Sequence, residues 1–191
     1  MRPRNDTQIT CCCFDLETTN LCADFGVILC GVVKPSTAEA RVFRSDTLNP
    51  RWASRRSDDR HVLKAIVEEL SHHDIWIAHN GNKFDVPFLR TRLAKWGLPP
   101  LPTKKLIDPL TLARNKLRMS WNSLEKIATF LNCNSKTDVE GDIWLKAALD
   151  GNTQAMNKIV THCIHDVYTL ERIVHSLKSY STNYNSWGSG F

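Results

Sequence analysis

The chain has 191 residues, of which 42% are apolar, so it is long enough to bury one ordinary hydrophobic core and we expect a single domain. Its formal net charge of +5 favours polyanions such as nucleic acid, although a solvated basic surface gives the same count. The polar N-terminal residues precede no long apolar segment, which argues against a secretory signal or a membrane span and for a soluble, cytoplasmic protein.

Seven cysteines do not read as a secreted disulfide framework. Three of them are adjacent, at residues 11–13, and neighbours on a strand point to opposite faces, so we expect reduced thiols. Zinc is disfavoured because no C-x-x-C or H-x-x-x-H spacing joins the candidate ligands Cys133, His162, Cys163 and His165.

The first part of the chain predicts three strands. Strand-forming and small apolar residues begin at Ile9 and lead to Phe14, a second apolar run covers residues 26–33, and residues 40–44 alternate between polar and apolar side chains. We expect these strands to form an antiparallel meander.

The remainder of the chain alternates helices with two short strands. Apolar residues at helical spacing predict a helix that starts after Asp58 or Asp59 and runs to about Leu70. The segments that follow are a strand at 75–78, a helix at 84–96 closed by Gly97, a strand at 105–107, and helices at 110–116, 123–131, 143–149 and 153–177. This order predicts an α/β domain, a mixed sheet covered by helices, over residues 1–178, and the polar tail 179–191 is expected to be disordered.

The first strand carries two carboxylates, Asp15 and Glu17, on one of its faces, because strand geometry sends residues i and i+2 to the same side. Two like charges in one small space are costly unless a hard divalent cation neutralises them. A solvated strand end is the alternative, and only acidic residues elsewhere in the chain can decide between the two.

Two more acidic residues are placed to join this pair. Asp85 follows the strand at 75–78 and begins a helix, at the type of sheet edge where α/β proteins build sites; a favourable helix-dipole partner is the alternative. Asp166 lies on the last helix with His162 one turn before it, and at 100° per residue both fall on one shoulder of the apolar stripe. His165 lies nearly opposite that stripe, so we predict that His162 faces the site.

Three motifs in this order resemble those of the DEDD superfamily of ribonuclease H-like 3′-5′ exonucleases: Asp15-x-Glu17, His79-Asn80-x-x-x-Phe84-Asp85 and His162-x-x-x-Asp166. The resemblance implies an α/β, ribonuclease H-like fold with a five-stranded mixed central sheet flanked by helices. It also implies a mechanism with two divalent metal ions, Mg²⁺ or Mn²⁺.

The resemblance further implies a role for each motif residue. Asp15 would bridge both metals, Glu17 and Asp166 would complete one of the two shells, and Asp85 would hold the other ion largely through water. Two cations about 3.5 to 4 Å apart activate water and stabilise the attacking and leaving oxygens. His162 would be the general base, because an ordinary histidine pKa of about 6.5 suits proton transfer near neutral pH.

The third motif departs from the family pattern. The histidine branch places its His five residues before the Asp and the tyrosine branch places its Tyr four before, whereas His162 stands four before Asp166. We interpret this as a DEDDh-type site in the tyrosine-branch register. The departure bears on the pose of the base more than on the metal cluster, and Tyr168 lies on the wrong side of the helix to replace it.

Other residues are candidates for substrate contact. Thr18, Thr19 and Leu21 would line the terminal nucleotide, while Asn80 and Phe84 would contact sugar or base, with core burial as the alternative for Phe84. Candidates for attracting phosphates, or for ordinary surface roles, are Lys83, Arg90, Arg114, Lys116, Arg118 and Lys136. Trp121 is a candidate for stacking on an unpaired base.

These features predict a metal-dependent 3′-5′ exonuclease that releases nucleoside 5′-monophosphates from single-stranded nucleic acid, with DNA preferred over RNA. One alternative is an exoribonuclease that trims RNA ends, since nothing in the sequence reads the 2′-hydroxyl. The others are a ribonuclease H-like endonuclease and an inactive nucleic-acid-binding module of the same fold. The complete set of four carboxylates argues against the module, because binding alone needs no such costly cluster.

Overall fold

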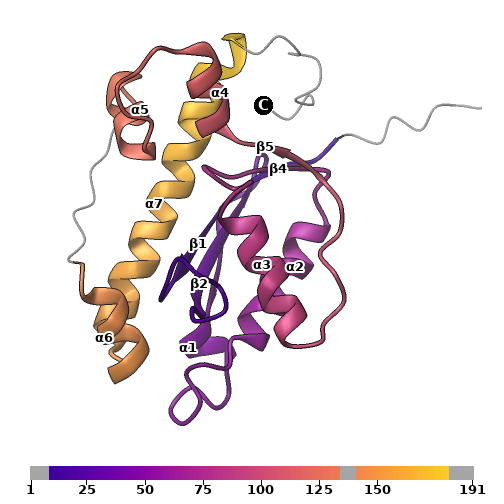
Figure 1. Cartoon of the computed structure of the whole chain (residues 1–191), viewed down its shortest axis with the longest axis vertical. Helices are drawn as coiled ribbons and strands as arrows, with labels where there is room; N and C mark the ends of the chain where they lie inside the picture. Colours follow the sequence, from indigo (N-terminus) through magenta and orange to yellow (C-terminus); the bar gives the residue numbers. More distant parts are fainter. Residues whose placement is uncertain (1–8, 134–140, 181–191) are drawn as a thin grey trace, which may run out of the picture.

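A five-stranded mixed sheet forms the centre of the protein, in a computed structural model that describes residues 9–133 and 141–180 (Figure 1). Its strand order is β3-β2-β1-β4-β5, with antiparallel pairing of β1 with β2 and of β2 with β3, and parallel pairing of β1 with β4 and of β4 with β5. The strands are β1 (Cys11–Thr18), β2 (Ile28–Pro35), β3 (Arg41–Arg44), β4 (Ile75–Ile77) and β5 (Lys105–Ile107). The predicted α/β fold with a mixed five-stranded sheet is confirmed.

Helices cover both faces of this sheet. They are α1 (Ser45–Leu48), α2 (Arg60–Ser71), α3 (Asp85–Lys95), α4 (Pro109–Lys116), α5 (Leu124–Phe130), α6 (Ile143–Asp150) and α7 (Thr153–Leu177), followed by a 3-10 turn, η1 (Lys178–Tyr180). Figure 1 shows the long helix α7 on one side of the sheet and α2 and α3 on the other. Within the described ranges, no helix combines the length and the apolar character needed to cross a membrane.

The residues of β1 alternate between the two layers of the core. Cys11 and Cys13 pack in the cluster that includes α7, whereas Cys12, Phe14 and Leu16 pack in the cluster that includes α2 and α3. Because successive side chains of a strand point to opposite faces, the next residues of the first series, 15 and 17, also lie on the α7 side. The seven cysteines all lie in the described ranges and form no disulfide there.

The structure corrects some predicted boundaries. Strand β2 continues through Lys34 and Pro35 instead of ending at residue 33, and the short helix α1 was not predicted. Lys34 is tolerated in the buried strand because its ammonium group lies 2.7 Å from a carboxylate oxygen of Glu171 on α7. Most of the tail predicted to be disordered, residues 181–191, lies outside the described residues.

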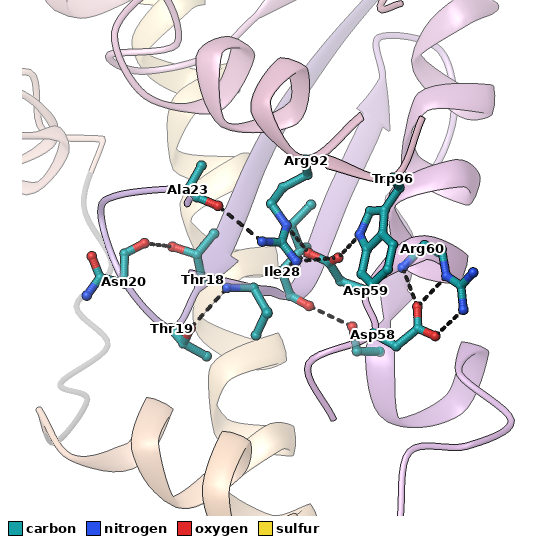
Figure 2. A network of polar contacts seen from close by, with 12 residues as sticks. Thr18, Thr19, Asn20, Ala23, Ile28, Asp58, Asp59, Arg60, Arg92 and Trp96 are labelled. Atoms are coloured by element: carbon teal, nitrogen blue, oxygen red, sulfur yellow. Dashed lines mark hydrogen bonds and ion pairs between the residues drawn. The ribbon is translucent and has the colours of Figure 1, made fainter. Parts of the chain in front are cut away.

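A fully buried ion pair connects α2, α3 and the start of β2. The Asp59 carboxylate, just before α2, accepts hydrogen bonds from Nε and Nη2 of Arg92, both at 2.8 Å, and from Trp96 Nε1 at 2.7 Å. It also accepts the backbone N–H of Ile28 at 3.0 Å, and Arg92 Nη1 donates to the carbonyl of Ala23 at 3.1 Å (Figure 2). Both charged side chains are 0% exposed. Each nitrogen of the guanidinium and each oxygen of the carboxylate therefore has a hydrogen-bond partner inside the protein.

Replacing Arg92 by Met is expected to lower the free energy of unfolding by about 3–5 kcal/mol, because it leaves the buried Asp59 charge without its partner. Urea unfolding followed by circular dichroism measures this loss. The exposed pair of Asp142 with Lys146 serves as the control, and Asp142→Ala should leave the unfolding midpoint nearly unchanged. Equal effects of the two substitutions would contradict this account of the buried pair.

Candidate active site

Three elements bring acidic side chains to one end of the sheet. Asp15 and Glu17 come from β1, Asp85 is the first residue of α3, and Asp166 lies on α7. Burial, and then the charges of the other three carboxylates, raise the pKa of Asp15 well above its usual range. The four carboxylates thus lie near enough for their charges to act on Asp15, although they are up to 151 positions apart in the sequence.

Glu17 and Asp166 are joined by the imidazole of His162. Nε2 of His162 lies 3.6 Å from Oδ2 of Asp166 and 3.9 Å from Oε1 of Glu17. Burial raises the pKa of Glu17 to about 7, and the Asp166 charge adds to this shift. His162 thus contacts carboxylates from two different elements.

His165 also approaches the cluster. Its Nδ1 lies 3.6 Å from Oδ1 of Asp166, opposite the oxygen that faces His162. The helix-face argument expected His165 to point away, but its side chain is only 20% exposed. The two histidines therefore flank Asp166, and the contact with Glu17 is what distinguishes His162.

Asp85 presents a buried oxygen that lacks a partner. The residue is 1% exposed, its carboxylate accepts backbone N–H groups of Leu16 and of Asp85 itself, and Oδ1 has no hydrogen-bond partner among the described residues. Burial raises its pKa to about 7. Buried polar atoms are ordinarily satisfied, so an orphaned carboxylate oxygen beside other carboxylates fits a site for a hard divalent cation.

A fifth acid stands close to Asp85. Asp108 is 7% exposed, and its Oδ1 accepts the backbone N–H of Leu110 at 3.0 Å and that of Asn80 at 2.9 Å. Burial lowers the pKa of the neighbouring His79, while the Asp108 charge opposes that shift. Through Oδ1, Asp108 thus caps the start of α4 and holds the backbone of Asn80.

A cavity of about 490 Å³ opens beside Glu17. Four of the five predicted substrate residues line it, namely Thr18, Thr19, Leu21 and Phe84. The fifth, Asn80, is not among the lining residues; its backbone is left-handed, with φ of 60°, and its N–H is used by Asp108. The remaining walls come from Leu16, Asn20, Gly141, Trp144 and Leu145.

The segment between β1 and β2 forms one wall of this cavity and is held at both ends. Thr19 and Val27 exchange two hydrogen bonds of 3.1 Å, and Thr18 Oγ1 donates to the carbonyl of Asn20 at 2.9 Å. In its middle, the carbonyl of Ala23 accepts from the buried Arg92 (Figure 2). The wall therefore has fixed anchors even though the Leu21 side chain is 81% exposed.

Two contacts of the site were not predicted. Cys163, on α7, is fully buried, and its Sγ donates to the backbone oxygen and to Oδ2 of Asp15, both at 3.5 Å. Trp144, on α6, donates its indole N–H to Oε2 of Glu17 at 2.7 Å. The donor atoms of Asp15, Glu17 and Cys163 all lie within 4.8 Å of one another.

The other sequence candidates are more dispersed. Cys133 contacts Ser176, which stands 13 residues beyond Cys163 on α7, about 20 Å along the helix, so the disfavoured zinc grouping is not assembled. Trp121 is 72% exposed. Five candidates for phosphate attraction are exposed, namely Lys83, Arg90, Arg114, Lys116 and Arg118. Lys136 lies outside the described residues.

Comparison with known proteins identifies the family. The RNase_H_2 family model, described as RNase_H superfamily, matches residues 12–178. The chain belongs to the RNase_H superfamily. This confirms the family that the three motifs predicted and supports a nuclease as the class of enzyme, whereas the roles of single residues stay predictions.

The curated relatives of this superfamily member are much longer proteins. It is 30% identical over 132 residues to the DNA polymerase III PolC-type of Ureaplasma parvum, an alignment that covers 60% of this chain and 9% of that protein. It is 37% identical over 87 residues to the DNA polymerase III PolC-type of Mycoplasma genitalium, covering 44% and 5%. The chain thus spans less than a tenth of their length.

A solved structure shows the same fold. The family B DNA polymerase from the archaeon Pyrobaculum calidifontis matches 88% of this chain and 24% of its own, with a TM-score of 0.71 and 16% sequence identity. At 16% identity this match shows only that the fold is shared.

The raised carboxyl pKa values predict how pH affects the metal-free protein. The Asp85 carboxyl has a pKa of about 7 when folded, against an ordinary value of 3.8, so between these values the folded state holds a proton that the unfolded state has released. Stability contributed by this group therefore falls as pH rises through the window. In EDTA, Asp85→Asn should gain stability relative to the wild type between about pH 4 and pH 7. Urea unfolding of both proteins across that range measures the difference, and a constant difference would contradict the assignment.

Proposed function

We propose that the protein is a divalent-metal-dependent 3′-5′ exonuclease that acts on single-stranded nucleic acid, preferentially DNA, and releases nucleoside 5′-monophosphates. The observation that carries this proposal is the convergence of four carboxylates from β1, α3 and α7, with an imidazole between two of them, at the edge of one cavity. Bringing four carboxylates together in a buried place is energetically unfavourable, and a surface that only binds nucleic acid would gain nothing from it.

Asp15, Glu17, Asp85 and Asp166 would hold two ions, Mg²⁺ or Mn²⁺, because their oxygens suit hard cations. When bound, such ions activate the attacking water and stabilise charge on both the attacking and the leaving oxygen. The orphaned Oδ1 of Asp85 supports this occupancy from within the structure.

His162 would act as the general base. It would accept a proton from the water that attacks phosphorus, while the bond from phosphorus to the 3′ oxygen of the penultimate nucleotide breaks and that oxygen takes a proton from solvent. The carboxylate of Asp166, 3.6 Å from Nε2, would stabilise the imidazolium that forms. The neighbouring Glu17, whose Oε1 lies 3.9 Å from the same nitrogen, would contribute to that stabilisation.

The cavity walls favour a single strand. Thr18, Thr19 and Leu21 stand beside Glu17, so a terminal nucleotide seated there would place its 5′ phosphate near the carboxylates. A volume of about 490 Å³ lies in the range of pockets that hold one small ligand, which supports a single terminal nucleotide as the occupant. The names of the relatives, DNA polymerases, support DNA as the preferred substrate, and no polymerase activity is carried over to this chain.

Asp15→Asn is expected to abolish cleavage without unfolding the protein, since it removes a cation ligand and also relieves repulsion among the carboxylates. Stepwise shortening of a 5′-labelled single-stranded DNA in Mg²⁺ or Mn²⁺ measures the activity, with EDTA as the blank and RNA of the same sequence as the competing substrate. Asp150→Asn, the same change at an exposed position on α6, is the matched control. Wild-type turnover by Asp15→Asn would refute the proposed site, and internal cuts would indicate an endonuclease instead.

His162→Ala is expected to lower kcat by about 10²–10⁴-fold, the usual contribution of a general base. His165→Ala is the matched control, because it removes the other imidazole beside Asp166 but not the contact with Glu17. A larger loss in His165→Ala than in His162→Ala would transfer the role to His165.

A further inference from the structure

We propose that Trp144 is a positioning residue that orients Glu17 and His162 together, so that the metal ligand and the general base keep one mutual geometry. This inference rests on the proposed function and adds a residue to it. Trp144 belongs to none of the three motifs and lies on α6, an element that contributes no carboxylate to the cluster.

One indole ring contacts both partners. Its Nε1 donates to Oε2 of Glu17 at 2.7 Å, a charge-assisted hydrogen bond. Its ring meets the imidazole of His162 edge to face, with centroids 6.2 Å apart and planes at 86°. The indole N–H of Trp144 therefore contacts a residue of β1, while its ring contacts a residue of α7.

The two oxygens of the Glu17 carboxylate make different contacts. Oε2 is occupied by the indole, so Oε1 is the oxygen that points to His162, 3.9 Å away. A carboxylate on a flexible side chain otherwise takes a broad range of orientations about its last bond. With Trp144 in place, one rotamer is favoured before any cation arrives.

The position of the indole does not depend on Glu17. Ile143 and Ala147, on either side of Trp144 in α6, are buried in the core cluster of α7 and the sheet. The far end of α6 is held by Arg56, whose Nη1 donates to the carbonyl of Leu149 at 3.2 Å. Because α6 is anchored at both ends by other contacts, the indole can constrain Glu17 and not the reverse.

Trp144→Phe separates the two functions of the ring, since phenylalanine keeps an aromatic edge against His162 but lacks the N–H. Outer-sphere hydrogen bonds to metal ligands are typically worth about 10–100-fold in metal affinity, so Mn²⁺ should bind about tenfold more weakly or worse. Calorimetry with MnCl₂, without nucleic acid, measures this directly, and kcat on single-stranded DNA should fall as well. Trp52→Phe is the matched control, because Trp52 packs at the margin of the core away from the cavity lining.

A second measurement tests the contact itself in the metal-free protein. Of the six indole N–H signals in a ¹H–¹⁵N spectrum, the one absent in Trp144→Phe belongs to Trp144. Glu17→Ala should shift that signal more than the other five, whether or not the protein cleaves DNA.

The outcomes are separable. If the wild type binds Mn²⁺ and Trp144→Phe binds it equally well, the positioning role is wrong and the exonuclease proposal survives. If the wild type binds no Mn²⁺, both the proposed function and the positioning role of Trp144 are wrong. Weaker binding in Trp144→Phe, unchanged binding in Trp52→Phe and a shifted indole signal in Glu17→Ala together support it.

Discussion

Crowding of like charges in a nearly water-free place is the constraint on which the rest of this structure depends. The Asp15 and Asp85 carboxylates lose hydration where their elements meet the core, and each is surrounded by other acids. In a medium of low dielectric this repulsion is strong, so the metal-free protein responds with raised pKa values. A fold keeps such a cluster only when the surrounding packing is firm enough to hold the charges together.

The buried ion pair of Asp59 and Arg92 contributes to this rigid packing. It joins two helices to the first residue of β2 and to the segment that walls the cavity, so the helix that begins with Asp85 and the cavity wall are held by one framework (Figure 2). An exposed ion pair would not serve this purpose, since exposed pairs contribute little and are screened by salt. Full burial gives the network directional hydrogen bonds that few alternative arrangements can satisfy.

The sequence predicted the layout because its signals are local. The alternation along β1 predicted that Asp15 and Glu17 share one face, and the helical period predicted that His162 lies beside Asp166. The structure has both arrangements. Tertiary contacts have no such period: Trp144 stands 127 residues from Glu17, and nothing near it in the sequence marks it. The same limit applies to His165, because a helical projection gives the direction of a side chain but not how far its ring extends toward a neighbour.

The strict alternation of β1 makes this strand intolerant of changes in length. Deleting one residue between Cys11 and Phe14 would move every later side chain of the strand to the other face, turning the two acids toward the apolar layer under α2 and α3 and Leu16 toward the α7 side. Insertions in the segment after Thr19 would not move the side chains of β1 to the opposite face. A change in the length of β1 therefore disturbs both layers of the core at once, whereas a change in the segment after it disturbs only the cavity wall.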